Sequence, residues 1–103
     1  MMDKLTQKSQ EALKAARELA RERSHQELDG PHLALALTQQ TGTIVPMLLQ
    51  RAGVDLASWE SDLNTELDRR AQVEGVSSSD VFLSRDLKQA LDRAEQEAKA
   101  LTD

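Results

Sequence analysis

The chain of 103 residues contains no cysteine and no tyrosine, and it has only one tryptophan and one phenylalanine. The lack of cysteine excludes a disulfide framework and thiol chemistry, and it fits a reducing compartment. Because aromatic residues are almost absent, leucine and alanine must fill the core. A chain of this length forms one small domain, or part of one, with little margin for a core.

Long apolar runs are also missing. No segment approaches the length of a membrane span, and the first ten residues, MMDKLTQKSQ, lack the apolar centre of a secretion signal. We therefore expect a cytoplasmic protein without a membrane partner. The net charge of −5 is spread along the chain, with basic residues among the carboxylates. Nucleic acid is not an expected partner, because binding it requires a basic face.

The most abundant residue types favour helix. Ala, Leu, Glu, Gln, Lys and Arg dominate, and no stretch alternates as a half-buried strand would, so the predicted class is all-α. The expected helices run from about residue 3 to 23, from Asp29, from Thr43 to Gly53, from Asp55 and from Ser84, each of the last four starting at a residue that can cap a helix. Pro31 and Pro46 suit first turns, and Gly53 suits a helix end. The expected apolar stripe of the second helix is Leu33, Ala36 and Leu37, and Trp59 is expected in the core or at its edge.

The first and last helices carry matching apolar stripes. A shift of 78 positions superposes Leu5, Ala12, Leu13, Ala16 and Ala20 on Leu83, Ala90, Leu91, Ala94 and Ala98. This predicts a duplicated unit, with a first four-helix repeat at 1–70, a loop at 71–83 and the first helix of an incomplete second repeat at 84–103. Duplication is not the sole reading of the match, since any two Ala/Leu helices match to some degree and a five-helix bundle could close by itself.

Motifs for chemistry are lacking. The four glycines are too far apart for a phosphate-binding loop, so we expect no ATP hydrolysis by this chain, no catalytic residue and no cofactor. His25 and His32 straddle a helix start without a further ligand, so no metal site is expected, and His32 is assigned a packing or hydrogen-bonding role. A triad drawn from Ser77, Ser78 or Ser79 with His25 and Asp80 has no motif to fix it and is taken as coincidence.

Several stretches together resemble the N-terminal (Clp N) domain of the Clp group of AAA+ protein-remodelling ATPases. They are LTQKSQEALKAARELA, DGPHLALAL, TIVPMLLQRAGVD, AQVEG and SRDLKQALDRAEQEAK, which cover nearly the whole chain. The stretch AQVEG looks more like the ClpB-type disaggregases than their protease-coupled relatives. The chain departs from the family pattern at Ser9, usually a large apolar residue, and at Pro31, where protease-coupled relatives carry a glutamate implicated in phosphoarginine binding. The second repeat also lacks its last three helices.

The resemblance implies a non-catalytic module, joined to the AAA+ ring of a parent chain, that binds unfolded or aggregated polypeptides. The residues that it implies for this binding are Thr6, Leu91 and Asp103, although Thr6 could equally be a helix-start residue. The departure at Pro31 argues against phosphoarginine recognition. An alternative interpretation is a self-associating adaptor, a homo-oligomer in which Leu87, Leu91, Ala94 and Leu101 pack against a second copy.

Overall fold

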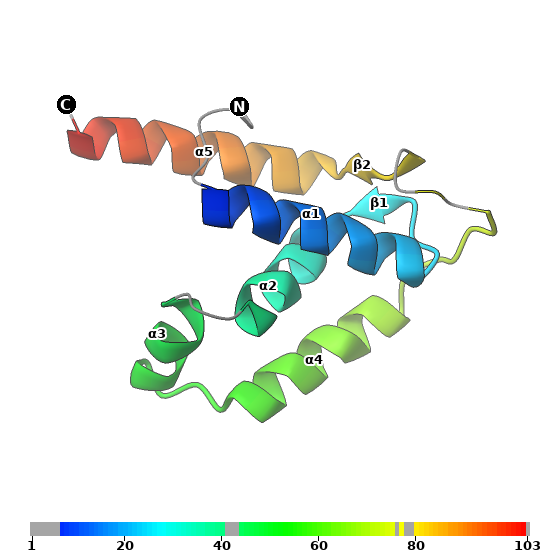
Figure 1. Cartoon of the computed structure of the whole chain (residues 1–103), viewed down its shortest axis with the longest axis horizontal. Coiled ribbons are helices and arrows are strands. Elements are labelled where there is room, and N and C mark those ends of the chain that lie inside the picture. The colour runs from blue at the N-terminus through cyan, green and yellow to red at the C-terminus, as the bar shows by residue number, and fades with distance from the viewer. Residues whose placement is uncertain (1–6, 41–43, 76, 78–79, 103) are drawn as a thin grey trace.

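The computed structural model describes residues 7–40, 44–75, 77 and 80–102, and in these ranges it contains five helices and two very short strands. The elements are α1 (Gln7–Glu22), β1 (Glu27–Leu28), α2 (Gly30–Gln39), α3 (Val45–Arg51), α4 (Leu56–Asp68), β2 (Phe82–Leu83) and α5 (Arg85–Thr102). Figure 1 shows α5 along the upper edge, α1 below it, α2 in the middle and α4 along the lower edge. The predicted all-α class is confirmed, whereas the two strands were not predicted.

The end of α1 is a tight turn at a residue other than glycine. Ser24 has a φ of 60°, in the left-handed region. Its N–H donates to the carbonyl of Arg21 at 2.9 Å, and the N–H of His25 donates to the carbonyl of Ala20 at 2.7 Å. This pair of bonds is the Schellman motif, which satisfies carbonyls at a helix end. The turn directs the chain into β1, and His25 within it is buried.

The predicted helix signals of the middle region are largely confirmed. Pro46 lies in the first turn of α3, and Gly53 follows that helix with a φ of 86°. Asp55 caps α4, because its carboxylate accepts a hydrogen bond from the N–H of Ala57 at 3.1 Å. Thr43, the predicted cap of α3, lies outside the described residues, and the N-cap position is occupied by Ile44.

Helix α2 packs against α1, α3 and α4. The stripe predicted for it was wrong in part, since its buried residues are His32, Leu35, Ala36 and Thr38, while Leu33 and Leu37 are half-buried. A helix with neighbours on several sides buries more than one stripe, which a single-face pattern does not anticipate. Trp59, on α4, is half-buried and donates its indole N–H to the hydroxyl of Thr38 at 2.8 Å. Its predicted place at the edge of the core is confirmed.

The core is formed by residues of α1, β1, α2 and α5, together with Val81, which precedes β2. Its central cluster consists of Ala16, Ala20, Leu28, Ala36, Val81 and Leu87. Strands β1 and β2 pair in parallel, Glu27 with Phe82 and Leu28 with Leu83. The guanidinium of Arg17 donates to the carbonyl of Val81 at 3.0 Å. The segment predicted as a loop at 71–83 therefore ends in a strand that fixes the start of α5.

Helix α5 touches this core with its first turns only. Leu87 is 4% exposed and Leu91 is half-buried, but Leu101 is 88% exposed, and Ala90, Ala94 and Ala98 are exposed. The matching residues of α1, Ala12, Leu13, Ala16 and Ala20, are all buried. The two helices thus share a sequence pattern but occupy different surroundings, and the duplicated unit stays a prediction. No helix in the described part of the chain is long and apolar enough to cross a membrane.

Candidate functional site

Only one of the three residues predicted to bind polypeptide falls in the described part of the chain. Thr6 and Asp103 lie outside the described residues. Leu91 is half-buried and packs against the core cluster. Leu91 therefore lies on α5 between the first turns, which pack on the core, and the second half of the helix, which is exposed to solvent.

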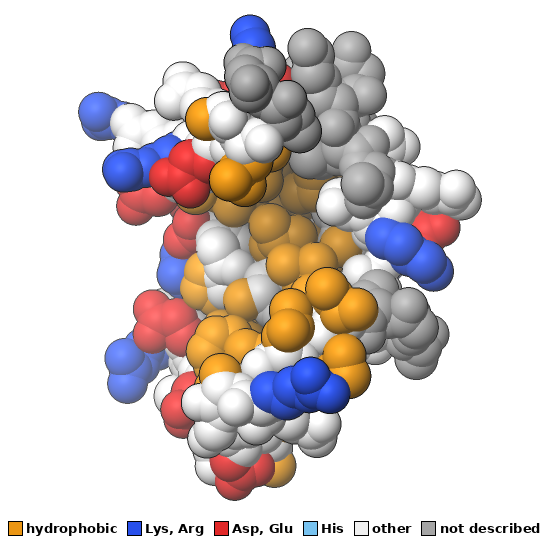
Figure 2. Space-filling view, turned by 90° about the vertical axis from the view of Figure 1, so that its left-hand side faces the viewer, with side chains coloured by type: hydrophobic (Ala, Val, Ile, Leu, Met, Phe, Trp, Pro, Cys, Tyr) orange, Lys and Arg blue, Asp and Glu red, His pale blue; other side chains and the backbone are white. Residues whose placement is uncertain are grey.

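Four of the large exposed apolar side chains belong to α3, the residue before it and the end of α5, whereas Val73 and Phe82 are exposed beside His25. On and beside α3, Ile44, Met47 and Leu48 are between 45% and 62% exposed, and on α5 Leu101 is 88% exposed. Figure 2 shows hydrophobic side chains lining a hollow at this end of the molecule, below the end of α5 and above α3. We call the apolar residues of this end the α3–α5 surface; they are Ile44, Met47, Leu48, Ala90, Ala94, Ala98 and Leu101. Exposed apolar side chains on two neighbouring parts of one face offer a place where another chain can pack.

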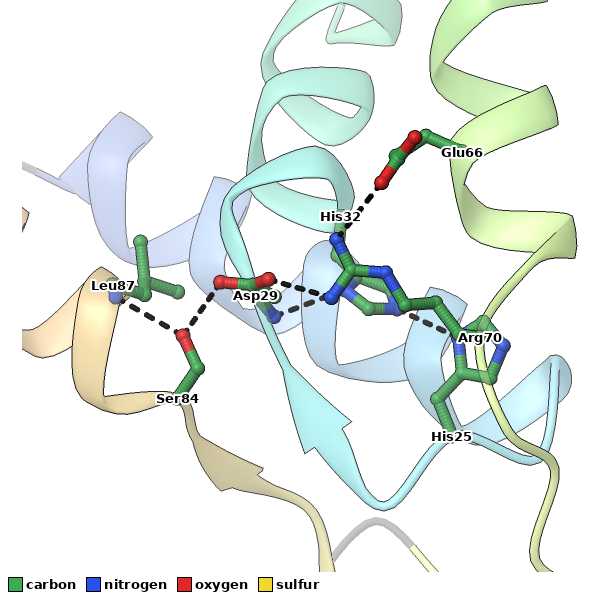
Figure 3. Close-up of polar contacts among 7 residues, drawn as sticks. All are labelled: His25, Asp29, His32, Glu66, Arg70, Ser84 and Leu87. Atoms are coloured by element: carbon green, nitrogen blue, oxygen red, sulfur yellow. Dashed lines mark hydrogen bonds and ion pairs between the residues drawn. The ribbon is translucent and has the colours of Figure 1, made fainter.

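A second constellation, polar and partly buried, joins the start of α2, the residues after α4 and the start of α5 (Figure 3). The carboxylate of Asp29 accepts hydrogen bonds from the hydroxyl of Ser84 at 2.6 Å and from the guanidinium of Arg70 at 2.7 Å. Ser84 in turn accepts from the N–H of Leu87 at 3.0 Å, and Arg70 also faces Glu66 at 3.6 Å. One carboxylate thus connects the start of α2, the start of α5 and the end of α4.

The two histidines belong to the same constellation. The N–H of Asp29 donates to Nδ1 of His32 at 3.0 Å, so Nδ1 carries no proton. The proton of neutral His32 is therefore on Nε2, which lies 2.8 Å from Nδ1 of His25 and donates to it. Each imidazole is fixed as one neutral tautomer, and the hydrogen-bonding role predicted for His32 is confirmed.

Burial keeps both imidazoles neutral. It lowers the pKa of His32 to about 4, with the nearby His25 adding to the effect, and it also lowers the pKa of His25, together with the charges of Arg23 and Arg70. Burial alone would raise the pKa of Asp29. The hydrogen bonds from Ser84, from the N–H of Gly30 and from Arg70 outweigh it, so that the pKa of Asp29 is lowered. A charged Asp29 beside neutral histidines is the stable state.

This arrangement is suited to holding helices together rather than to catalysis. Nδ1 of His25 accepts from His32, and the hydroxyl of Ser77 donates to Asp80 at 2.9 Å, so Ser77 is not bonded to His25 as a triad requires. Ser78 and Ser79, the other serines considered, lie outside the described residues. No group of three or more possible metal-binding side chains occurs among the residues that the structure describes. The Asp29 constellation was missed at the sequence level, where Asp29 and Ser84 were each assigned only a local capping role.

Comparison with known proteins agrees with the helical architecture. The family model described as the Clp repeat (R) N-terminal domain matches residues 4–103. The chain is 38% identical over 94 residues to the chaperone protein ClpB 1 of Parasynechococcus marenigrum (strain WH8102), covering 91% of this chain and 11% of that protein. It is also 38% identical over 102 residues to the chaperone protein ClpB of Nitratidesulfovibrio vulgaris, covering 97% of this chain and 12% of that protein. The ClpB of Bdellovibrio bacteriovorus is 38% identical over 95 residues, with 92% and 11% covered.

These matches extend over nearly all of the chain, although the chain spans only 11–12% of the length of the relatives. They include both α1, with its buried stripe, and α5, with its exposed one. The chain therefore belongs to the family of Clp repeat N-terminal domains, and its curated relatives are ClpB chaperones.

Proposed function

We propose that this chain is a non-catalytic polypeptide-binding module of a ClpB-like disaggregase, and that the α3–α5 surface contacts unfolded or aggregated polypeptides. The observation that carries the proposal is the exposure of apolar side chains on α3 and on the second half of α5. Unfolded polypeptides expose apolar side chains, and burying these against an apolar surface is favourable by about 25 cal/mol for each Å².

The proposal assigns a role to each of the three residues predicted from the sequence. Leu91 would form the inner wall of the surface, since it links the core to the exposed half of α5. Thr6 and Asp103 would add polar contacts at the ends of the first and last helices. The relatives named ClpB support a ClpB-like module as the wider assignment.

A titration with permanently unfolded casein, followed by fluorescence anisotropy, tests the proposal. Replacing Met47 and Leu48 with serine should weaken casein binding, because both side chains are about half exposed and belong to the surface. Val73→Ser is the matched control, since Val73 is 40% exposed but lines a different cavity, beside His25 and Phe82.

Thr6→Ala and Asp103→Ala should each weaken casein binding as well. No binding by the intact chain, or equal binding by the intact chain, the Met47/Leu48 variant, Thr6→Ala and Asp103→Ala, would contradict a substrate role. The activity of a whole disaggregase also requires an ATP-driven ring, and we propose such a ring as the partner of this module within a longer chain.

The exposed stripe of α5 favours one other function, self-association. Leu87, expected to pack against a second copy, is instead buried in the core cluster of its own chain. The exposed Ala94 and Leu101, together with Ala98, would be buried against the same residues of a second copy. Light scattering over a range of concentrations separates the two functions. A monomer at every concentration would exclude self-association, whereas a dimer whose formation abolishes casein binding would favour it over the substrate role.

A further inference from the structure

Helices α1 and α2 form a second, separate groove. It is open, has a volume of about 500 Å³ and is lined by no residue of α3 or α5. Its apolar lining consists of Ala12, Ala15, Leu19 and Ala36. Ala12 and Ala36 are buried and form its floor, while Ala15 is exposed and Leu19 is half-buried, so an approaching chain would contact the latter two. We call this the α1–α2 groove.

Carboxylates form one rim of the α1–α2 groove. Glu11, Glu18 and Glu22 all line it, and their spacing of seven and four residues places them on one face of α1. At 1.5 Å per residue, they extend over roughly 16 Å of helix. An extended polypeptide of about five residues has the same length.

The ion pairs that Lys8 and Arg21 form on this rim are exposed to solvent. The ammonium of Lys8 is 3.8 Å from Glu11, and both side chains are at least half exposed. Arg21 pairs with Glu18 at 2.9 Å, also in contact with solvent. Exposed pairs of this kind contribute at most about 1 kcal/mol, so an incoming cation can replace them. Glu22 has no ion pair with another residue in the described ranges.

The opposite rim has no charged side chain but carries the partial negative charge of a helix end. Gln39 and Gln40, at the end of α2, line the groove, and the last turn of this helix contains no basic residue. The C-terminal end of a helix carries a partial negative charge, which a lysine or arginine usually offsets. The amide of Gln40 is held in place by donating to the carbonyl of Lys8 at 2.9 Å. Both rims therefore favour a cation.

We propose that the α1–α2 groove binds a positively charged segment of another polypeptide. Its lysine or arginine side chains would pair with Glu11, Glu18 and Glu22, and its small or apolar residues would lie over Ala15 and Leu19. Charge complementarity selects this occupant, and the net charge of −5 would speed its approach. The site is separate from the α3–α5 surface, and it goes beyond the function proposed above.

A labelled peptide of alternating lysine and alanine, with a second peptide carrying glutamate in place of lysine, tests the proposal by fluorescence anisotropy. The lysine peptide should bind to the intact chain, more weakly as salt is raised, and the glutamate peptide should not bind. Replacing Glu18 and Glu22 with glutamine should weaken binding by about five- to tenfold. The control variant, Asp62→Asn with Glu74→Gln, removes the same charge from exposed positions outside the groove and should change binding by less than about twofold.

Equal weakening in both variants would overturn the proposal, because only net charge would then matter. Binding of the glutamate peptide, or no binding of the lysine peptide, would overturn it as well. The result of the peptide experiment can be distinguished from the result of the casein experiment. Loss of casein binding in the Met47/Leu48 variant with unchanged binding of the lysine peptide would support two distinct surfaces, whereas loss of both in the same variant would overturn their separation.

Discussion

The hydroxyl of Ser84 donates a 2.6 Å hydrogen bond to the carboxylate of Asp29, which lies 55 positions earlier in the chain. The same hydroxyl oxygen accepts the N–H of Leu87 and so caps α5. Ser84 therefore serves α5 locally and joins it to the start of α2. Asp29 occupies the N-cap position of α2, where it forms a capping box with His32, and its carboxylate also accepts from Ser84 and Arg70.

Ser84→Ala should lower the free energy of unfolding by about 1–3 kcal/mol, because the variant loses a helix cap and a hydrogen bond to a charged carboxylate. Urea denaturation followed by circular dichroism measures this loss. Ser77→Ala is the matched control, since Ser77 also donates to a carboxylate, that of Asp80, but is exposed. A loss at Ser84 no larger than at Ser77 would contradict the joining role.

Stability should fall as the pH is lowered from about 6.5 to about 4. The folded chain holds His32 with a pKa of about 4, whereas the unfolded chain has the ordinary value of 6.5. The unfolded state therefore binds more protons in this range, and stability is lost with acidification. The difference corresponds to about 3 kcal/mol for His32, with a further loss in the same direction from His25.

Proton NMR can follow this titration directly, because the chain contains only two histidines. Both imidazoles should titrate below pH 6.5 in the folded protein, and His32 should titrate last as the pH falls. An imidazole resonance of His32 that titrates at the ordinary value would contradict its burial and its bond to the N–H of Asp29.

The helices could be predicted from the sequence because their signals are local. Caps such as Asp55 and Ser84, and the glycine at position 53, can be recognised from the few residues on either side of them. Strands β1 and β2 could not be predicted, since two residues are too few for a period to show. The pairing between them depends on how α1 and α5 pack, which no local pattern specifies.

Thr38→Val should destabilise the fold by about 1–2 kcal/mol. The hydroxyl of Thr38 accepts from the indole of Trp59 and donates to the carbonyl of Ala34 at 2.7 Å, so valine leaves a partly buried N–H without its partner. Thr65→Val is a close control: Thr65 makes the same bond to a carbonyl four residues earlier, that of Ser61, but is exposed.

Thermal unfolding monitored by the fluorescence of Trp59 measures both variants. Equal melting temperatures for Thr38→Val and Thr65→Val would contradict a stabilising contact between Trp59 and Thr38. The fluorescence of folded Thr38→Val should also change, because the indole loses its acceptor.

The candidate site was only partly accessible from the sequence. The apolar stripe of α5 was visible as a pattern, but a pattern does not state whether a stripe is covered. In the fold, Ala16 on α1 is fully buried and Ala94, its counterpart on α5, is exposed. The α1–α2 groove was equally hidden, because Glu11, Glu18 and Glu22 look like any solvated helix face until α2 is placed beside them.

Two leucines of α5 provide the sharpest test of how far this helix is covered. Leu87→Ala should lower the free energy of unfolding by about 2–4 kcal/mol, because Leu87 is 4% exposed within the core cluster. Leu101→Ala should change it by less than about 0.5 kcal/mol, since Leu101 is 88% exposed. Urea denaturation at several protein concentrations measures both. A large loss for Leu101→Ala that grows with protein concentration would mean that a second copy covers the end of α5. Equal and small losses at every concentration would instead contradict the packing of Leu87.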